Sequence, residues 1–215
     1  MKQILCFGDS NTYGLVPNEN RRYEWGVRWT SILDEGIRDK GYRVVEEGLC
    51  GRTTIFEDAY RLGRKGTDVL PILLETHSPI EAVVLMLGTN DCKAAYGASA
   101  KDIGKGIEQL LDQIGEKAAP DKILLISPIA LGDRVWQPGF DEEFNENSVT
   151  VSKELPKVYE KIARKRGIHF LKASDYAKPS LADQEHLNEK GHKRLGEAIL
   201  REIEGILEFR RSVAC

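Results

Sequence analysis

Four short segments of the chain carry groups that together could catalyse acyl transfer. They read FGDS with Ser10, LCGR with Gly51, GTND with Asn90, and DQEH with Asp183 and His186. A serine hydroxyl becomes a nucleophile when a histidine takes its proton, and the histidine needs a carboxylate to fix its tautomer. Asp183 and His186 are three residues apart, so both side chains can point the same way from one turn. These residues predict a catalytic triad.

Acyl transfer also needs hydrogen-bond donors aimed at the oxyanion that develops in the transition state. The backbone N–H groups of Ser10 and Gly51 and the side-chain amide of Asn90 are the candidate donors. A glycine at position 51 would let the backbone approach a substrate closely. We therefore expect an oxyanion hole built from three separate segments.

Each of these residues has a simpler explanation when it is taken alone. Ser10 and Asn90 are common turn residues, Gly51 fits a positive backbone φ, Asp183 fits a helix cap, and a solvated His186 at a helix start is ordinary. Their joint occurrence favours the catalytic interpretation, because each segment follows an expected strand or precedes the last expected helix.

The elements that must position these groups alternate between strand and helix. Short apolar runs predict strands at residues 3–7, 43–46, 82–87, 123–127 and 168–171, and helical patterns occur near 25–39, 68–76, 100–117, 148–166 and 188–208. Several of the strands are continuously apolar, as strands buried on both faces are. The alternation predicts a parallel sheet with helices on both faces, whose ligands bind at the carboxyl ends of the strands.

Composition limits the class of protein. A length of 215 residues is typical of one domain, 1–215, and a net charge of −3 gives no basic footprint for nucleic acid. No apolar run reaches the roughly 18 residues of a membrane span. The scattered cysteines Cys6, Cys50, Cys92 and Cys215 show no metal-ligand spacing. Together with a first segment that lacks the pattern of a signal peptide, this predicts reduced thiols in a cytoplasmic protein.

Three other features need an interpretation. The loops at 14–24 and 130–147 contain Tyr23, Trp136 and Phe140, which would either wall a pocket or anchor the loops. His192 competes with His186 as a base, but it falls inside the last helix and is interpreted as a surface or packing histidine. Cys50 and Cys92 lie near the expected site and are interpreted as packing residues.

The four segments resemble the blocks of the SGNH (GDSL-type) hydrolases. The matching stretches are FGDSNTYG, GLCGRTT, MLGTND and DQEHLNEKGH, and they span nearly the whole chain. ILCFGDS, the EEG and RTT segments and MLGTNDCK are most similar to the arylesterase and acyltransferase branch of bacterial esterases.

This resemblance implies a three-layer α/β/α, flavodoxin-like fold with five parallel strands in the order 2-1-3-4-5. It implies that Ser10 is the nucleophile, His186 the base and acid, and Asp183 its partner, with Ser10, Gly51 and Asn90 as the oxyanion hole. Asp9 and Asp91 would hold the loops as supporting residues. The family needs no metal or organic cofactor, and a small-molecule ester is the implied substrate. Related esterases of this branch often assemble, which leaves a homo-oligomer open.

The sequence departs from the family at a few positions. Asn11 replaces the usual leucine after the serine, and Tyr13 and Leu15 stand where the acyltransferase branch often has tryptophans. The second difference favours hydrolysis of short-chain acetyl or aryl esters, with acyl transfer as a side activity. A lysophospholipase or a carbohydrate acetylesterase remains an alternative, as does a flavodoxin-like phosphate- or nucleotide-binding domain. For the esterase, activity should rise near pH 6 to 7 as His186 loses its proton.

Overall fold

The computed structural model describes residues 1–208 and contains one five-stranded parallel sheet with strand order β2-β1-β3-β4-β5. The strands are β1 (Lys2–Gly8), β2 (Tyr42–Gly48), β3 (Ile80–Met86), β4 (Ile123–Ser127) and β5 (His169–Lys172). This is the order implied by the family resemblance, so the fold prediction is confirmed. Cys215 lies outside the described residues.

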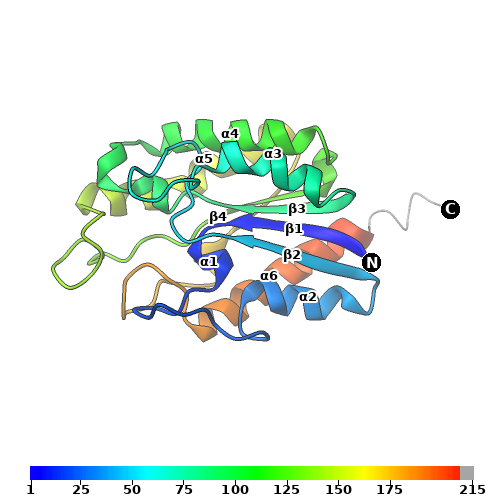
Figure 1. Ribbon diagram of the computed structural model, residues 1–215, viewed down its shortest axis with the longest axis horizontal. Helices are drawn as coiled ribbons and strands as arrows, with labels where there is room; N and C mark the ends of the chain where they lie inside the picture. Colours follow the sequence, from blue (N-terminus) through cyan, green and yellow to red (C-terminus); the bar gives the residue numbers. More distant parts are fainter. Residues whose placement is uncertain (209–215) are drawn as a thin grey trace.

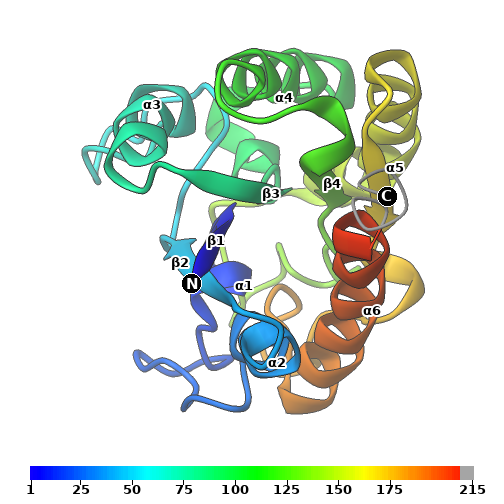
Figure 2. The same ribbon diagram turned by 90° about the vertical axis from the view of Figure 1, so that its right-hand side faces the viewer.

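Six α-helices within residues 1–208 complete the architecture. They are α1 (Ser10–Tyr13), α2 (Trp29–Arg38), α3 (Gly66–Thr76), α4 (Ala100–Gly115), α5 (Glu146–Arg166) and α6 (Glu189–Glu208). Figure 1 shows α3, α4 and α5 on one face of the sheet and α2 and α6 on the other. Figure 2 shows the same two helical layers from the side of the molecule. The result is the expected three-layer α/β/α arrangement.

The alternation of side chains along the strands explains the two layers. In β1, Leu5 and Phe7 belong to the apolar cluster under α3, α4 and α5, while Ile4 and Cys6 belong to the cluster under α2 and α6. Successive strand side chains point to opposite faces, so a strand covered on both sides must be apolar at every position. The continuous apolar runs in the sequence have this cause.

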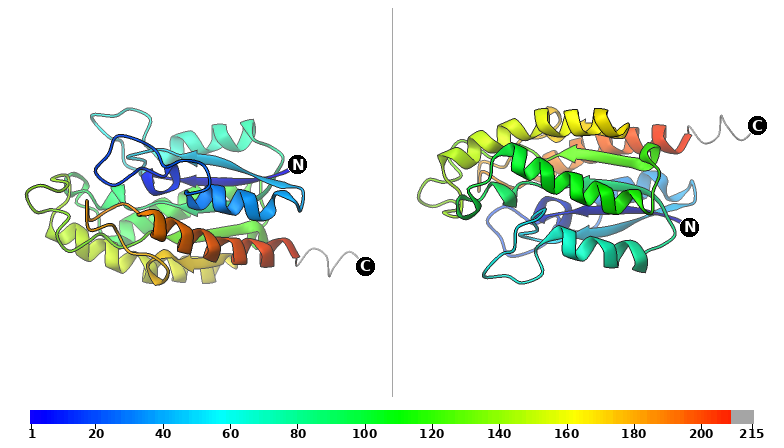
Figure 3. Two further views of the ribbon diagram at one scale, coloured as in Figure 1. Left: turned by 90° about the horizontal axis from the view of Figure 1, so that it is seen from below. Right: turned by 90° about the horizontal axis from the view of Figure 1, so that it is seen from above.

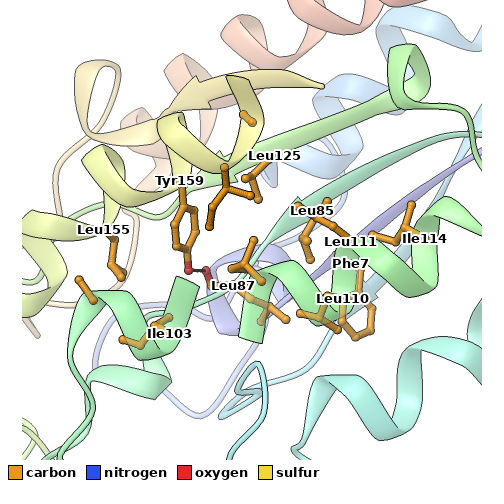
Figure 4. Packing of buried hydrophobic residues seen from close by; sticks show 14 of the residues in the cluster. Phe7, Leu85, Leu87, Ile103, Leu110, Leu111, Ile114, Leu125, Leu155 and Tyr159 are labelled. Carbon is orange, nitrogen blue, oxygen red and sulfur yellow. Dashed lines mark hydrogen bonds between the residues drawn. The ribbon is translucent and has the colours of Figure 1, made fainter. Parts of the chain in front are cut away.

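The larger cluster extends to the end of the sheet where the strands finish. Figure 4 shows Tyr159 of α5 among these apolar side chains. Its buried hydroxyl donates a hydrogen bond of 2.8 Å to the carbonyl oxygen of Leu87, directly after β3. A buried hydroxyl is costly without a partner. This bond therefore fixes the backbone just before the segment that carries Asn90.

The start of one helix and the presence of another differ from the expectation. The helix expected from residue 25 begins at Trp29, because Gly26 has a φ of +90° and Arg28 is extended. The four-residue helix α1 was not expected, since four residues are too few to show a helical period. Figure 3 shows that the long loops lie at the opposite end of the molecule from the N-terminus. They therefore surround the carboxyl ends of the strands.

Candidate active site

The first functional turn follows β1 directly. Asp9 caps α1 by accepting a hydrogen bond of 3.0 Å from the Asn11 N–H, and Ser10 is the first residue of that helix. The short helix lies so close to β2 that a Cβ at Gly48 would meet the Tyr13 nitrogen at 2.1 Å. No other residue type fits that position without moving the backbone. Gly48 thus allows α1 to lie against β2 and to hold Ser10 at the carboxyl end of β1.

The second turn is built by Asp183. One carboxylate oxygen, Oδ1, accepts the N–H groups of Glu185 at 3.1 Å and His186 at 3.0 Å. The other, Oδ2, lies 2.8 Å from Nδ1 of His186. Gln184 between them has a φ of +65°, which closes the turn tightly. Asp183 therefore shapes the loop and orients the imidazole with the same carboxylate.

These two turns meet, although they are far apart in the chain. His186 Nε2 lies 2.8 Å from Ser10 Oγ, and both side chains are buried together with Asp183. Hydrogen bonds from the N–H groups and from His186 outweigh the effect of burial and lower the pKa of Asp183. The ionised carboxylate selects the tautomer with the proton on Nδ1. Nε2 is then free to accept the proton of Ser10.

The charge of the imidazole depends strongly on its neighbours. Burial alone would lower the pKa of His186, but the carboxylates of Glu185, Asp183 and Asp9 raise it to about 9. His186, the candidate base, therefore loses its proton at higher pH than an ordinary histidine, whose pKa is about 6.5. The expected rise in activity near pH 6 to 7 assumed an ordinary histidine pKa and did not take the charges of these three carboxylates into account.

The candidate oxyanion donors come from three neighbouring strand ends. Ser10, Gly51 and Asn90 follow β1, β2 and β3, which are paired side by side. Gly51 has a φ of +81°, and Asn90 Nδ2 donates a hydrogen bond of 3.1 Å to the Arg52 carbonyl. Within residues 1–208 the N–H groups of Ser10 and Gly51 donate to no other protein group. One Asn90 amide proton and both N–H groups thus remain available.

The two supporting aspartates are buried among these segments. Asp91 accepts hydrogen bonds of 2.9 and 3.0 Å from the Thr54 N–H, which ties the loop after β2 to the end of β3. Burial raises the pKa of both Asp9 and Asp91 to about 6. Asp9 holds α1, and Asp91 holds the segment that carries Gly51.

Two residues at the site were missed by the sequence analysis. Asn11 Oδ1 accepts the Leu187 N–H at 2.9 Å, and its Nδ2 donates to the Glu185 carbonyl at 3.5 Å. Asn11 thus holds the backbone on both sides of His186. The carboxylate of Glu185 is buried, with Oε1 3.8 Å from His186 Nε2. Glu185 could have been recognised from the sequence, because it directly precedes His186.

The competing histidine is a packing residue. His192 is fully buried, its Nδ1 accepts the Trp29 N–H at 3.3 Å, and its ring meets Tyr23 edge-on. Burial, with Arg28 and His186 nearby, lowers the pKa of His192 to about 3. The neutral ring belongs to the interface of α2 and α6.

The structure also shows the environments of the cysteines and of the loop aromatics. Cys6, Cys50 and Cys92 are free thiols, and burial raises the pKa of each. A raised pKa keeps a thiol protonated and unreactive. Of the two loop aromatics that remain, Phe140 lines the cavity beside the triad, whereas Trp136 is partly exposed and does not line it.

A cavity of about 450 Å³ opens beside His186. Leu15 and Phe140 provide apolar walls, and Glu185 lines the cavity beside His186. Five further polar side chains of the loops at 14–24 and 130–147 also line it: Asn18, Glu19, Asn20, Asp141 and Glu142. The cavity is therefore polar and acidic.

Neither a metal-binding cluster nor a membrane-spanning helix is found among residues 1–208. No group of three or more His, Cys, Asp or Glu side chains there is arranged to hold a metal ion. Among the helices of the same residues, none has the length and apolar character needed to cross a lipid bilayer.

Similarity to known proteins agrees with this geometry. The model of the GDSL-like lipase/acylhydrolase family matches residues 6–194. The native aryl esterase of M. smegmatis is 33% identical with a TM-score of 0.87, covering 96% of this chain and 100% of that chain. Est24, a carbohydrate acetylesterase from Sinorhizobium meliloti, is 31% identical with a TM-score of 0.86 and the same two coverages. No curated protein sequence matches the chain.

A more distant structure shares the fold. The lipase/acylhydrolase from Enterococcus faecalis is 22% identical with a TM-score of 0.69, covering 95% of this chain and 96% of that chain. The family match and the closer similarities define the class: the chain belongs to the GDSL-like lipase/acylhydrolase (SGNH hydrolase) family. It is accordingly a serine hydrolase that acts on ester bonds.

Proposed function

We propose that the protein hydrolyses short-chain carboxylic esters, acetyl or aryl, through an acyl-enzyme formed on Ser10. The observation that carries this proposal is the unbroken line of hydrogen bonds from Ser10 Oγ to His186 Nε2 and from His186 Nδ1 to Asp183 Oδ2, each 2.8 Å long. It joins a nucleophile, a base and an orienting carboxylate in the geometry that acyl transfer requires.

In the proposed mechanism, Ser10 Oγ attacks the ester carbonyl while His186 Nε2 takes the hydroxyl proton. The tetrahedral intermediate collapses, the bond to the alcohol oxygen breaks, and the alcohol leaves with the proton from Nε2. A water molecule then gives its proton to Nε2 and attacks the acyl-enzyme. Collapse of the second intermediate releases the acid and returns the proton to Ser10. Asp183 holds the imidazole in orientation throughout.

The negative oxygen of both intermediates would be bound by the N–H groups of Ser10 and Gly51 and by the Asn90 amide. Their position at three adjacent strand ends, without other acceptors among residues 1–208 for the two N–H groups, supports this role. Donors fixed by folding do not have to reorganise during the reaction, which is the main reason that such sites accelerate it.

Short esters are proposed because the cavity is modest and polar. It is walled by only two apolar residues, Leu15 and Phe140, and a long acyl chain would need a more extended apolar surface. Leu15 stands where tryptophan is common in the acyltransferase branch, and charged side chains line the same cavity. Water should therefore reach the acyl-enzyme, with transfer to other alcohols as a side activity.

The test is a panel of p-nitrophenyl esters from acetate to palmitate, run with and without a serine-directed phosphonate. We expect acetate to butyrate to be preferred, the phosphonate to abolish turnover, and its mass to appear on Ser10. S10A is the matched control, since it removes one oxygen atom and should be neither active nor labelled. Absence of turnover by well-folded wild type, or labelling of S10A, would contradict the proposal.

A carbohydrate acetylesterase is the second candidate, favoured by the polar lining of the cavity. Est24 is such an enzyme and is similar over 96% of this chain. Acetylated monosaccharides added to the panel separate the two, because a dedicated enzyme would prefer them to aryl acetates. A strong preference for palmitate would instead indicate a lysophospholipase.

We further propose that residues 1–215 form a single catalytic domain that works without a cofactor or a nucleic-acid partner. The single sheet, the family match over residues 6–194 and the net charge of −3 support this. The free thiols of Cys6, Cys50 and Cys92 support a cytoplasmic location. Sedimentation of the pure protein would establish whether it is a homo-oligomer.

A further inference from the structure

Glu185 is a buried acid whose carboxylate makes no hydrogen bond to Ser10, His186 or Asp183 and acts on His186 through its charge. Its side chain is 8% exposed, and no hydrogen bond to its carboxylate is formed within residues 1–208. His186 Nε2, 3.8 Å from Oε1, is its charged neighbour. That nitrogen already pairs with Ser10 Oγ at 2.8 Å. An ionisable group buried in this way costs free energy unless a partner compensates it.

Glu185 lies near the nitrogen that would protonate the leaving group. His186 Nε2 gives its proton to the departing alcohol, so the alcohol oxygen must lie within hydrogen-bond distance of that nitrogen. A carboxylate 3.8 Å from the same nitrogen is therefore close to the first atoms of the alcohol. A charged group two carbons beyond the ester oxygen would lie about 3–4 Å from it, which is within reach of Glu185.

The cavity beyond Glu185 has the same sign of charge. Glu19, Asp141 and Glu142 line it, and no Lys or Arg is among the described residues of its lining. Arg21 pairs with Glu19, and the Arg134 guanidinium lies 5.6 Å from the Phe140 ring centre, both outside the lining. An alcohol that entered this cavity would meet a negative potential.

We infer that Glu185 selects esters whose alcohol carries a positive charge, an ammonium group placed about two carbons from the ester oxygen. This inference rests on the proposed esterase function and names the substrate class of the same site. When His186 is neutral, as a base must be, Glu185 loses its charged neighbour at Nε2, and a bound cation supplies another. Burial raises the pKa of Glu185 to about 7, so the site should be fully charged in mildly alkaline solution.

The test compares two acetates of nearly identical shape, acetylcholine and its uncharged isostere 3,3-dimethylbutyl acetate, at pH 8.5. The measured quantity is the ratio of their kcat/KM values in one enzyme, because a change in the triad affects both esters alike. The ammonium also makes choline a better leaving group, which raises the ratio in every variant. The change of the ratio from wild type to variant, not its absolute value, therefore reports on Glu185. We expect the ratio to fall roughly tenfold from wild type to E185Q.

E189Q is the matched control. Glu189 begins α6 three residues after His186, is exposed and does not line the cavity. The same change of charge there should leave the ratio within twofold of wild type. Should E185Q fail to fold, inhibition of the wild type gives the same comparison. Choline should then inhibit at least threefold more strongly than 3,3-dimethyl-1-butanol.

Two results would overturn the inference. One is an equal ratio in wild type and E185Q, and the other is equal inhibition by the two alcohols. Turnover of p-nitrophenyl acetate in the same preparation distinguishes these failures from failure of the proposed function. If that ester is cleaved, only the selectivity is wrong; if it is not, the esterase proposal fails first.

Discussion

Replacing Asn11 with leucine, the residue usual in the family, should loosen His186, the proposed catalytic base. Asn11 accepts the Leu187 N–H at 2.9 Å and donates to the Glu185 carbonyl at 3.5 Å. N11L removes both hydrogen bonds while keeping a side chain of similar size. The two peptide groups that flank His186 then lose their link to the turn that carries Ser10.

The expected magnitude follows from these contacts. The bond to Leu187 is short and buried, so leaving that N–H unpaired costs about 1–3 kcal/mol, whereas the longer bond adds little. Burial of the leucine offsets part of this loss, which leaves a net destabilisation of about 1–2 kcal/mol. For a domain of this size the melting temperature should fall by about 2–8 °C. A small displacement of His186 should lower kcat roughly tenfold, with little change in KM.

Calorimetry and ester kinetics on N11L and N188A test this reasoning. Asn188 caps the Gly191 N–H at 2.9 Å in the same segment but does not touch His186. N188A should lose about 1 kcal/mol of stability and keep kcat within twofold. A kcat that is equally reduced in both variants would show a general loss of stability. An unchanged melting temperature and kcat in N11L would refute the positioning role.

The other predictions concern the triad and its surroundings. Asn90→Ala should lower kcat by about 10²–10³ with a small change in KM, measured by steady-state kinetics, and an undiminished kcat would place the third donor elsewhere. Asp183→Asn should slow turnover by up to about 10⁴ while circular dichroism shows an intact fold. Because only neutral His186 can take a proton, kcat/KM should rise with pH toward its pKa of about 9. Removing the negative charge in Glu185→Gln should shift that rise to lower pH, and identical profiles with a midpoint near 6.5 would contradict this. His192→Ala should lose stability through its buried cavity, measured by thermal unfolding, yet stay near full kcat, which an inactive but folded variant would exclude.

The fold could be predicted because its strands are buried on both faces. Such strands give continuous apolar runs that a sequence displays directly, and the strand order came with the family resemblance. The start of α2 could not be predicted, since it depends on the φ of Gly26 and on an extended Arg28. The helix α1 escaped because its capping by Asp9, rather than a periodic pattern, makes it helical.

Some features of the site could likewise be predicted from the sequence, and others could not. Ser10, Asp183 and His186 could be predicted to meet because their chemistry is recognisable from residue types and their segments end at one edge of the sheet. Asn11 could not be assigned a role, because its partners lie 174 and 176 residues away and are backbone groups. The pKa of His186 was expected to be ordinary because the burial of Glu185 and Asp9 beside it is a property of the packed structure.

The distance of 176 residues between Ser10 and His186 has a consequence for the growing polypeptide. Ribosomes add roughly 5–20 residues per second, so about 9–35 s separate the synthesis of the proposed nucleophile from that of its proposed base. During this interval the hydroxyl has no partner to activate it, and the emerging chain cannot acylate itself on cellular esters. Reactivity begins only when the last segment docks against the first turn. By the proposed mechanism, the chain therefore has no esterase activity until nearly all of it has been made.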